Sequence, residues 1–231
     1  MNKQTKFTKP KGFNSPIKLK EYEDFEVEST ERFCGYFMEQ KVLTRLVVPI
    51  EDAFRDPSYY RMVCNKISEL GEGDIVEFEI NSPGGALGGL VALLHAVRST
   101  EAETVAVVIG DAYSAASLLA LACDSIVIGQ YANFLCHSCN FGTRGKSADV
   151  RNHVNHTAAY AEEIFRDCYQ YFLTEEEISD VLEGKELYLN YKEINERLER
   201  KYAILKEMQE AECCGSPETC PNICECPLAE D

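Results

Sequence analysis

The sequence lacks the long apolar runs that a membrane-spanning helix needs. No run of about 18 apolar residues occurs, which argues against a membrane span. Lysines are frequent in residues 1–20, but no apolar segment follows them, so a secretory signal is not expected. Basic residues are also scarce overall: 23 Lys and Arg stand against 39 Asp and Glu, for a formal net charge of −16. Phosphate neutralisation needs an excess of Lys and Arg, so the charge argues against nucleic acid as a main partner.

A phosphate-binding Gly-x₄-Gly-Lys-Ser/Thr motif is absent as well, and no nucleotide site is expected in this chain. Cysteine, by contrast, is plentiful: there are 11, an odd number. Without an export signal, this usage predicts a cytoplasmic protein with mostly free thiols. The composition is ordinary for a folded protein, with 45% hydrophobic and 27% charged residues among 231. This length can bury one substantial core.

Shifts in composition divide the chain into three parts. Residues 1–35 are highly charged, basic first and then acidic, and predict a flexible N-terminal arm. Residues 36–208 carry the hydrophobic periodicity of a folded domain. Residues 209–231 form an acidic, Cys-rich tail without periodicity, which predicts disorder.

Strand and helix patterns alternate through the central part, which predicts an α/β fold with a mainly parallel sheet. Val76, Phe78 and Ile80 share one face of an expected strand, for example. Thr174 is expected to cap a helix with an acidic first turn. The expected strands cover residues 43–50, 74–81, 104–109 and 125–128, and the expected helices cover 57–70 (with Asp56 as N-cap), 86–98, 115–122, 147–172, 174–184 and 191–208.

Three short segments in residues 80–140 carry chemistry. Residues 81–85, Asn-Ser-Pro-Gly-Gly, follow a strand, and two glycines let backbone N–H groups approach a ligand. Ser114 lies between an apolar strand and an apolar helix, where the helix dipole favours developing negative charge. His137 follows a short apolar stretch. Taken singly, these are ordinary features: a tight turn, an N-cap serine and a structural histidine.

Together, the three segments supply the parts of an acyl-transfer site. Ser114 is the expected nucleophile, and His137 can take its proton. The N–H groups of Gly84 or Gly85 and of Ala115 can form an oxyanion hole.

In these segments the sequence resembles the ClpP family of serine peptidases. The resemblance rests on the Asn-Ser-Pro-Gly-Gly turn, on Gly-Asp-Ala-Tyr-Ser at 110–114, on Cys136-His137 and on the Gly-rich residues 142–149. Weaker similarity covers residues 40–198. The charged helix near the C-terminus is similar to that of divergent bacteriophage ClpP-like proteases.

The resemblance implies a ClpP/crotonase-like fold of stacked ββα units, with residues 147–172 as a long handle helix. It implies a serine endopeptidase that cleaves polypeptide substrates through an acyl-enzyme and needs no metal or organic cofactor. It also implies a homo-oligomer of stacked rings, in contact through the handle helix, which works with an ATP-dependent AAA+ unfoldase.

The third member of the expected catalytic triad does not align. Depending on the landmark chosen, Leu182 or Val181 falls where the family has an aspartate. Asp180 is the first candidate for this role and Glu183 the second, each at the cost of a shift in the alignment. A Ser–His dyad without an acid is the third possibility, because losing the orienting carboxylate slows catalysis without abolishing it.

Four other interpretations stay open. A crotonase-type acyl-CoA enzyme shares the fold and the oxyanion hole, but does not need the Ser–His pair. The unaligned aspartate allows a catalytically inactive structural subunit. A phage enzyme could process capsid proteins instead of degrading proteins in general. A metal site could draw on one of three groups: Cys136 with Cys139, His153 with His156, or the tail residues Cys213, Cys214, Cys220, Cys224 and Cys226.

Overall fold

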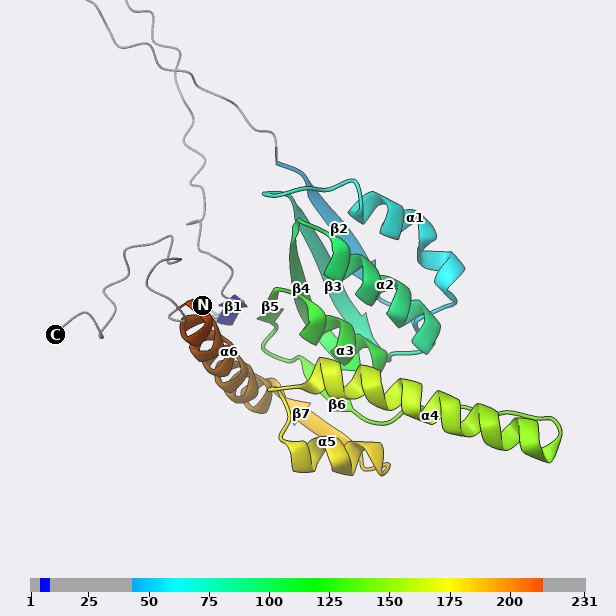
Figure 1. Cartoon of the computed structure of the whole chain (residues 1–231). Helices are drawn as coiled ribbons and strands as arrows, with labels where there is room; N and C mark the ends of the chain where they lie inside the picture. Colours follow the sequence, from blue (N-terminus) through cyan, green and yellow to red (C-terminus); the bar gives the residue numbers. More distant parts are fainter. Residues whose placement is uncertain (1–4, 9–42, 214–231) are drawn as a thin grey trace, which may run out of the picture.

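A computed structural model describes residues 5–8 and 43–213, and its strands and helices alternate along most of this length (Figure 1). The strands are β1 (Thr5–Thr8), β2 (Arg45–Ile50), β3 (Ile75–Ser82), β4 (Glu103–Tyr113), β5 (Ser125–Ile128), β6 (Asn133–Cys136) and β7 (Leu187–Asn190). The helices are α1 (Pro57–Ile67), α2 (Leu87–Ser99), α3 (Ala115–Ala122), α4 (Ser147–Tyr169), α5 (Glu175–Leu182) and α6 (Tyr191–Cys213). The predicted α/β class is therefore confirmed.

The described strands form one seven-stranded sheet. Its main path runs β1-β5-β4-β3-β2, and β6 pairs with both β4 and β7. Four pairs are parallel: β2 with β3, β3 with β4, β4 with β5, and β4 with β6. The two antiparallel pairs are β1 with β5 and β7 with β6. The mainly parallel sheet agrees with the prediction from alternating strand and helix patterns.

Helices α1, α2 and α3 cover one face of this sheet (Figure 1). The period-two pattern of β3 turns Val76, Phe78 and Ile80 toward these helices, and all three side chains are fully buried. Helix α3 is apolar on every side because the core surrounds it: Leu118 and Leu119 are also fully buried. This packing fixes the carboxyl ends of the central strands, where the candidate site lies.

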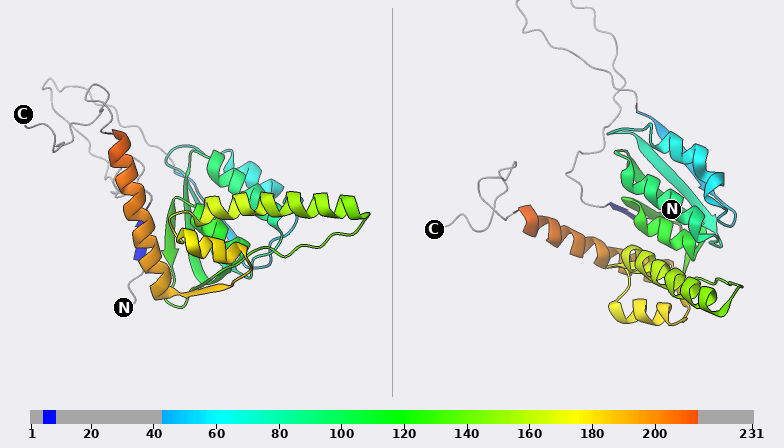
Figure 2. Two further views of the ribbon diagram at one scale, coloured as in Figure 1. Left: turned by 60° about the horizontal axis from the view of Figure 1, so that its bottom comes forward. Right: turned by 45° about the vertical axis from the view of Figure 1, so that its right-hand side comes forward.

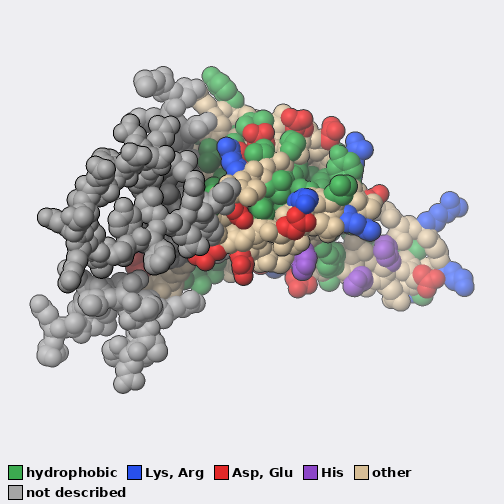
Figure 3. Space-filling view, turned by 90° about the horizontal axis from the view of Figure 1, so that it is seen from above, with side chains coloured by type: hydrophobic (Ala, Val, Ile, Leu, Met, Phe, Trp, Pro, Cys, Tyr) green, Lys and Arg blue, Asp and Glu red, His purple; other side chains and the backbone are tan. Residues whose placement is uncertain are grey.

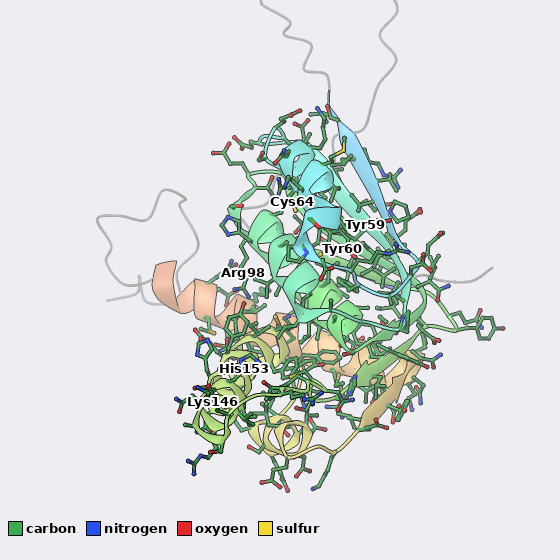
Figure 4. The ribbon with its side chains drawn as sticks, turned by 90° about the vertical axis from the view of Figure 1, so that its right-hand side faces the viewer. Tyr59, Tyr60, Cys64, Arg98, Lys146 and His153 are labelled. Atoms are coloured by element: carbon green, nitrogen blue, oxygen red, sulfur yellow. The ribbon has the colours of Figure 1, made fainter. Side chains whose placement is uncertain are left out.

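Helix α4 forms the expected long handle and projects beyond the body of the molecule (Figure 2). Its buried residues are Ala161, Phe165, Cys168 and Tyr169, all in its second half. The first half, from Ser147 to Tyr160, is mainly exposed to solvent. Figure 4 looks toward the projecting end, which carries Lys146 and His153. Near the buried end, Arg98 of α2 forms an ion pair with Asp167 of α4.

Several expectations need adjustment. The predicted handle helix ends three residues early, at Tyr169, and α6 continues through Cys213 instead of ending at Met208. The strands β1 and β7 were not expected: β1 lies in the charged N-terminal arm, and β7 is defined by its antiparallel pairing with β6 rather than by a local pattern. Asp56 is the N-cap of α1, but its side chain accepts no capping bond; Thr174 forms a complete capping box with Glu177. The rest of the predicted arm and the tail beyond Cys213 lie outside the described residues.

Candidate active site

The Gly-Gly turn that follows β3 is anchored from two sides. The Ser82 hydroxyl donates to the Asp52 carbonyl at 2.7 Å and accepts the Gly84 N–H at 3.2 Å. Phe54 continues the pairing beyond β2: its N–H donates to the Gly84 carbonyl at 2.7 Å, and its carbonyl accepts the Ala86 N–H at 2.9 Å. Gly84 has a φ of 87°, which a glycine adopts without steric cost. The turn is therefore a rigid part of the sheet edge.

The first and second motifs interlock at a bulge between β3 and β4. The register between these strands shifts between Ile80 and Ser82, which leaves Asn81 opposite the extra residues of β4. The Asn81 side-chain oxygen accepts the N–H of Asp111 at 3.0 Å. A Cβ on Gly110 would lie 2.4 Å from this same oxygen, so only glycine fits there. The Asn and the Gly of the two motifs thus depend on each other.

Ser114 occupies a strained turn between β4 and α3. Its φ of 56° and ψ of −121° lie in a region that residues other than glycine rarely adopt, at a cost of about 1–3 kcal/mol. The Ser114 N–H donates to the Leu135 carbonyl of β6 at 2.8 Å, which holds the turn in place. As the N-cap of α3, Ser114 lies beside the N–H groups of Ala115 and Ala116, which precede the first bond of the helix, from the Ser117 N–H to the Ser114 carbonyl. Negative charge that develops beside Ser114 is therefore favoured.

The Gly-Gly turn lies directly against this serine. A Cβ placed on Gly84 would be 2.6 Å from Ser114 Cβ and 3.1 Å from the Ala115 nitrogen. The Gly84 N–H is bonded to Ser82, whereas the Gly85 N–H has no acceptor among the described residues. The predicted nucleophile and the predicted oxyanion donors are thus close neighbours.

His137 reaches the same region from β6. This strand is parallel to β4, with Leu135 paired to Tyr113, so His137 and Ser114 follow the carboxyl ends of adjacent strands. Both side chains are half-buried. In the part of the chain that the structure describes, no hydrogen bond joins the Ser114 hydroxyl to the His137 imidazole. Catalytic hydrogen bonds often form only when substrate binds.

The two acidic candidates for the third member of the triad, Asp180 and Glu183, are not bonded to His137. The Asp180 carboxylate accepts the Lys185 ammonium at 2.5 Å, and Glu183 is exposed where α5 ends. Neither is hydrogen-bonded to His137 among residues 43–213. Of the two aligned positions, Leu182 lines a cavity of about 130 Å³ together with Ser138 and Cys139, the two residues that follow His137 in the chain, and Val181 is buried.

A buried polar group behind Ser114 was missed from the sequence. The Ser117 hydroxyl donates to the Ser114 carbonyl at 2.7 Å and lies 3.2 Å from the Tyr169 hydroxyl. Burial raises the pKa of Cys136 to about 12 and that of Tyr169 well above its ordinary value, so both stay neutral. The sequence contains one indication of this buried group: Ser117 is the one polar residue in the otherwise apolar helix α3.

Metal ligands and membrane helices were also sought. Residues 5–8 and 43–213 contain no group of three or more His, Cys, Asp or Glu that could hold a metal ion. The cysteines Cys214, Cys220, Cys224 and Cys226 lie outside the described residues. None of the described helices has the length and apolar character to cross a membrane.

A family model described as Clp protease matches residues 40–201, which is well over half of the chain and contains all three motifs. A search of curated proteins found no match.

Proposed function

The chain belongs to the Clp protease family, and from this premise we propose that it is a serine endopeptidase with Ser114 as nucleophile and His137 as general base. The observation that carries the proposal is the contact of the Gly-Gly turn with Ser114 and the Ala115 N–H. The first two motifs meet there, and His137 of the third follows the end of the adjacent strand β6, which supports acyl transfer as the chemistry of the site.

The proposed reaction has two halves. Ser114 Oγ attacks the scissile carbonyl carbon while the His137 imidazole takes the hydroxyl proton. The tetrahedral intermediate collapses, the peptide C–N bond breaks, and His137 returns the proton to the leaving amine. A water molecule then attacks the Ser114 ester with His137 again as base, which releases the acid product and restores the serine.

The oxyanion is assigned to two backbone donors. The Ala115 N–H opens α3 and benefits from the helix dipole. Of the two glycines, Gly85 is the better second donor because the Gly84 N–H already bonds to Ser82. Glycine is required at Gly85 in any case, since a Cβ would lie 2.5 Å from the Phe54 nitrogen. Preorganised N–H groups of this kind contribute about 10²–10³ in rate.

For the orientation of His137 we propose a Ser–His dyad. Asp180 pairs with Lys185, and the two aligned positions hold the apolar side chains of Val181 and Leu182, which supports an imidazole without a carboxylate partner. A dyad of this kind predicts a slow peptidase, because an orienting carboxylate is worth about 10⁴ in rate. Asp180 and Glu183 remain the alternatives, and substituting them tests this assignment.

The family premise also supports an oligomeric chamber. We propose stacked rings in which the exposed first half of α4 contacts the opposite ring. Val154 and Tyr160 are 38% and 42% exposed on that segment, which suits an interface. An AAA+ unfoldase partner, a cytoplasmic location and a bacteriophage-type role, including capsid processing, are further parts of the proposal that rest on the resemblance.

Hydrolysis of fluorogenic peptides by the purified, assembled chain tests the proposal. Ser114→Ala and His137→Ala should each lower kcat by at least about 10³-fold, since both groups act on the reacting atoms. Ser99→Ala, an exposed serine of α2, is the matched control and should keep wild-type activity. An assembled wild type without activity, or a Ser114→Ala variant with full activity, would refute the proposal. Acyl-CoA binding by an inactive wild type would favour the crotonase-type interpretation.

A further inference from the structure

A buried hydrogen-bonded group lies behind the nucleophile and joins three elements of the fold. Ser117 of α3 and Tyr169 of α4 are both fully buried. The Ser117 hydroxyl donates to the Ser114 carbonyl at 2.7 Å and lies 3.4 Å from the Leu135 carbonyl of β6. The Tyr169 hydroxyl is 3.2 Å from Ser117 Oγ.

The direction of these bonds follows from counting protons. A serine hydroxyl has one proton, and the short contact to the Ser114 carbonyl uses it. Ser117 Oγ must therefore accept from Tyr169, whose hydroxyl donates. Tyr169 also interacts with the thiol of Cys136, the residue before His137. One phenol thus contacts both the helix that begins at Ser114 and the strand that ends before His137.

The backbone of Ser114 needs such support. Its left-handed conformation costs about 1–3 kcal/mol and persists only where the surroundings hold it. The Ser114 N–H is held by Leu135, and its carbonyl is held by the Ser117 hydroxyl and by the N–H groups of Ser117 and Leu118. The Ser117 hydroxyl is the one side chain in this set, so it is the part that substitution can remove.

We propose that Ser117 and Tyr169 are positioning residues that hold Ser114 in its reactive conformation and fix it relative to the strand that carries His137. This inference rests on the proposed peptidase function. Neither residue touches the reacting atoms: they act through the Ser114 carbonyl and through β6. The hydroxyl groups, not the bulk of the side chains, carry this role.

The test uses variants that remove only the hydroxyl groups. In Tyr169→Phe and in Ser117→Ala, kcat for a fluorogenic peptide should fall about tenfold, which is the effect of one lost hydrogen bond at the chemical step. KM should stay within about twofold, since substrate binding is not affected. The double variant should lose no more than the stronger single variant, because both changes break one chain of bonds.

Two matched controls separate positioning from general destabilisation. Tyr202→Phe removes a hydroxyl from another largely buried tyrosine, and Ser179→Ala removes a serine hydroxyl that bonds within α5. Both should retain wild-type kcat. If the controls lose as much kcat as the network variants, or if the network variants keep wild-type kcat, the proposal is wrong.

Hydrogen exchange provides a readout that does not depend on activity. Amides in residues 110–118 and 133–138 should exchange faster in Tyr169→Phe and Ser117→Ala than in wild type, while β2 and β3 remain unchanged. Unchanged exchange in residues 110–118 would overturn the positioning role even if the chain were inactive. An inactive wild type, by contrast, refutes the peptidase function alone, so the two failures are distinguishable.

Discussion

Gly84 is the residue on which the geometry of the candidate site depends most directly. Its φ of 87° costs an alanine about 1–2 kcal/mol, and a Cβ would collide with the Tyr113 carbonyl and with Ser114 Cβ. We therefore expect Gly84→Ala to displace Ser114 and to lower the rate of fluorophosphonate labelling about 100-fold. Gly71→Ala is the control, because nothing lies within 4 Å of a Cβ there. Equal labelling of the two variants would contradict the geometry.

Substitution of Asp180 distinguishes a Ser–His dyad from a catalytic triad with an acidic third member. Its carboxylate bonds to Lys185 at the surface, where it is 37% exposed, and it has no bond to His137 among the described residues. We expect Asp180→Asn and Glu183→Gln to keep kcat within about threefold of wild type, far from the roughly 10⁴-fold loss of a triad carboxylate. Steady-state kinetics on a fluorogenic peptide measures this. A large loss in either variant would identify that residue as the third member.

The roles of single residues could be predicted from the sequence where the residues belong to a short motif with a specific chemistry. Ser114, His137 and the two glycines belong to short motifs, and the structure places Gly84 directly against Ser114. The partner of His137 could not be predicted, since an ion pair such as Asp180–Lys185 depends on how α5 and the following loop fold. Ser117 and Tyr169 are 52 positions apart, and no local pattern connects them.

At the scale of elements, α5 and α6 are joined by a bidentate ion pair. The Glu177 carboxylate accepts two guanidinium bonds from Arg197, at 2.6 and 2.8 Å, and also accepts the Thr174 N–H. Burial alone would raise the pKa of Glu177, but the bonds from Arg197 and Thr174 outweigh it and lower the pKa. The ion pair therefore stabilises the fold above the ordinary carboxyl pKa and loses this effect as the pH falls through the lowered one.

Glu177→Gln should consequently lower the free energy of unfolding at pH 7 by about 1–2 kcal/mol through the loss of the ion pair, because a glutamine at this position can still accept the Thr174 N–H. The difference from wild type should shrink as the pH falls through the lowered pKa of Glu177, where the carboxylate of the wild type becomes protonated. Thermal unfolding across this pH range measures the effect. The exposed Glu199→Gln serves as control, and a difference that is independent of pH would refute the ionic origin.

Elements were predictable where periodicity was long. Helices α3 and α4 begin where expected, and α3 also ends there, because their apolar patterns have clear limits. The short strand β7 is defined by pairing with β6, which is a tertiary contact with no signal of its own in the sequence. The bulge at Asn81 is likewise a product of two strands, although each motif alone contains half of it.

For the whole molecule, the projecting half of α4 is the feature that most needs a partner. Both views of Figure 2 show this half of the helix extending beyond the body of the molecule. The view from above shows basic and histidine side chains toward that end of the molecule (Figure 3). A helix of this length has little to bury against within one chain. Assembly with further copies would cover it, as the family premise suggests.

Charged substitutions on this helix test the assembly. Val154→Asp combined with Tyr160→Asp should convert stacked rings to single rings, halving the mass seen by native mass spectrometry, because each charge would be buried without a partner. Met62→Asp, which changes an 81% exposed apolar residue of α1, is the control and should leave the mass unchanged. A variant of unchanged mass would show that the contact lies elsewhere.

The sequence could predict the mainly parallel sheet and the projecting helix, because alternation and length are properties of one chain. Contacts between copies of the chain depend on surfaces that no pattern within one chain defines. The proposed rings and the unfoldase partner therefore rest on membership of the family alone. The roles of the N-terminal arm and of the Cys-rich tail are not defined by a pattern either, and most of both segments lies outside the described residues.

The most direct test of the account is to locate the adduct of a fluorophosphonate on the native, assembled protein by peptide mass spectrometry. Among the residues that the structure describes, Ser114 is the one that combines a strained turn, a helix N-terminus and adjacent backbone donors, so an activated serine is expected there. The account predicts a single adduct on Ser114 that disappears in Ser114→Ala and weakens in His137→Ala. A folded, assembled wild type that forms no adduct, or one that carries it on another serine, would contradict the account.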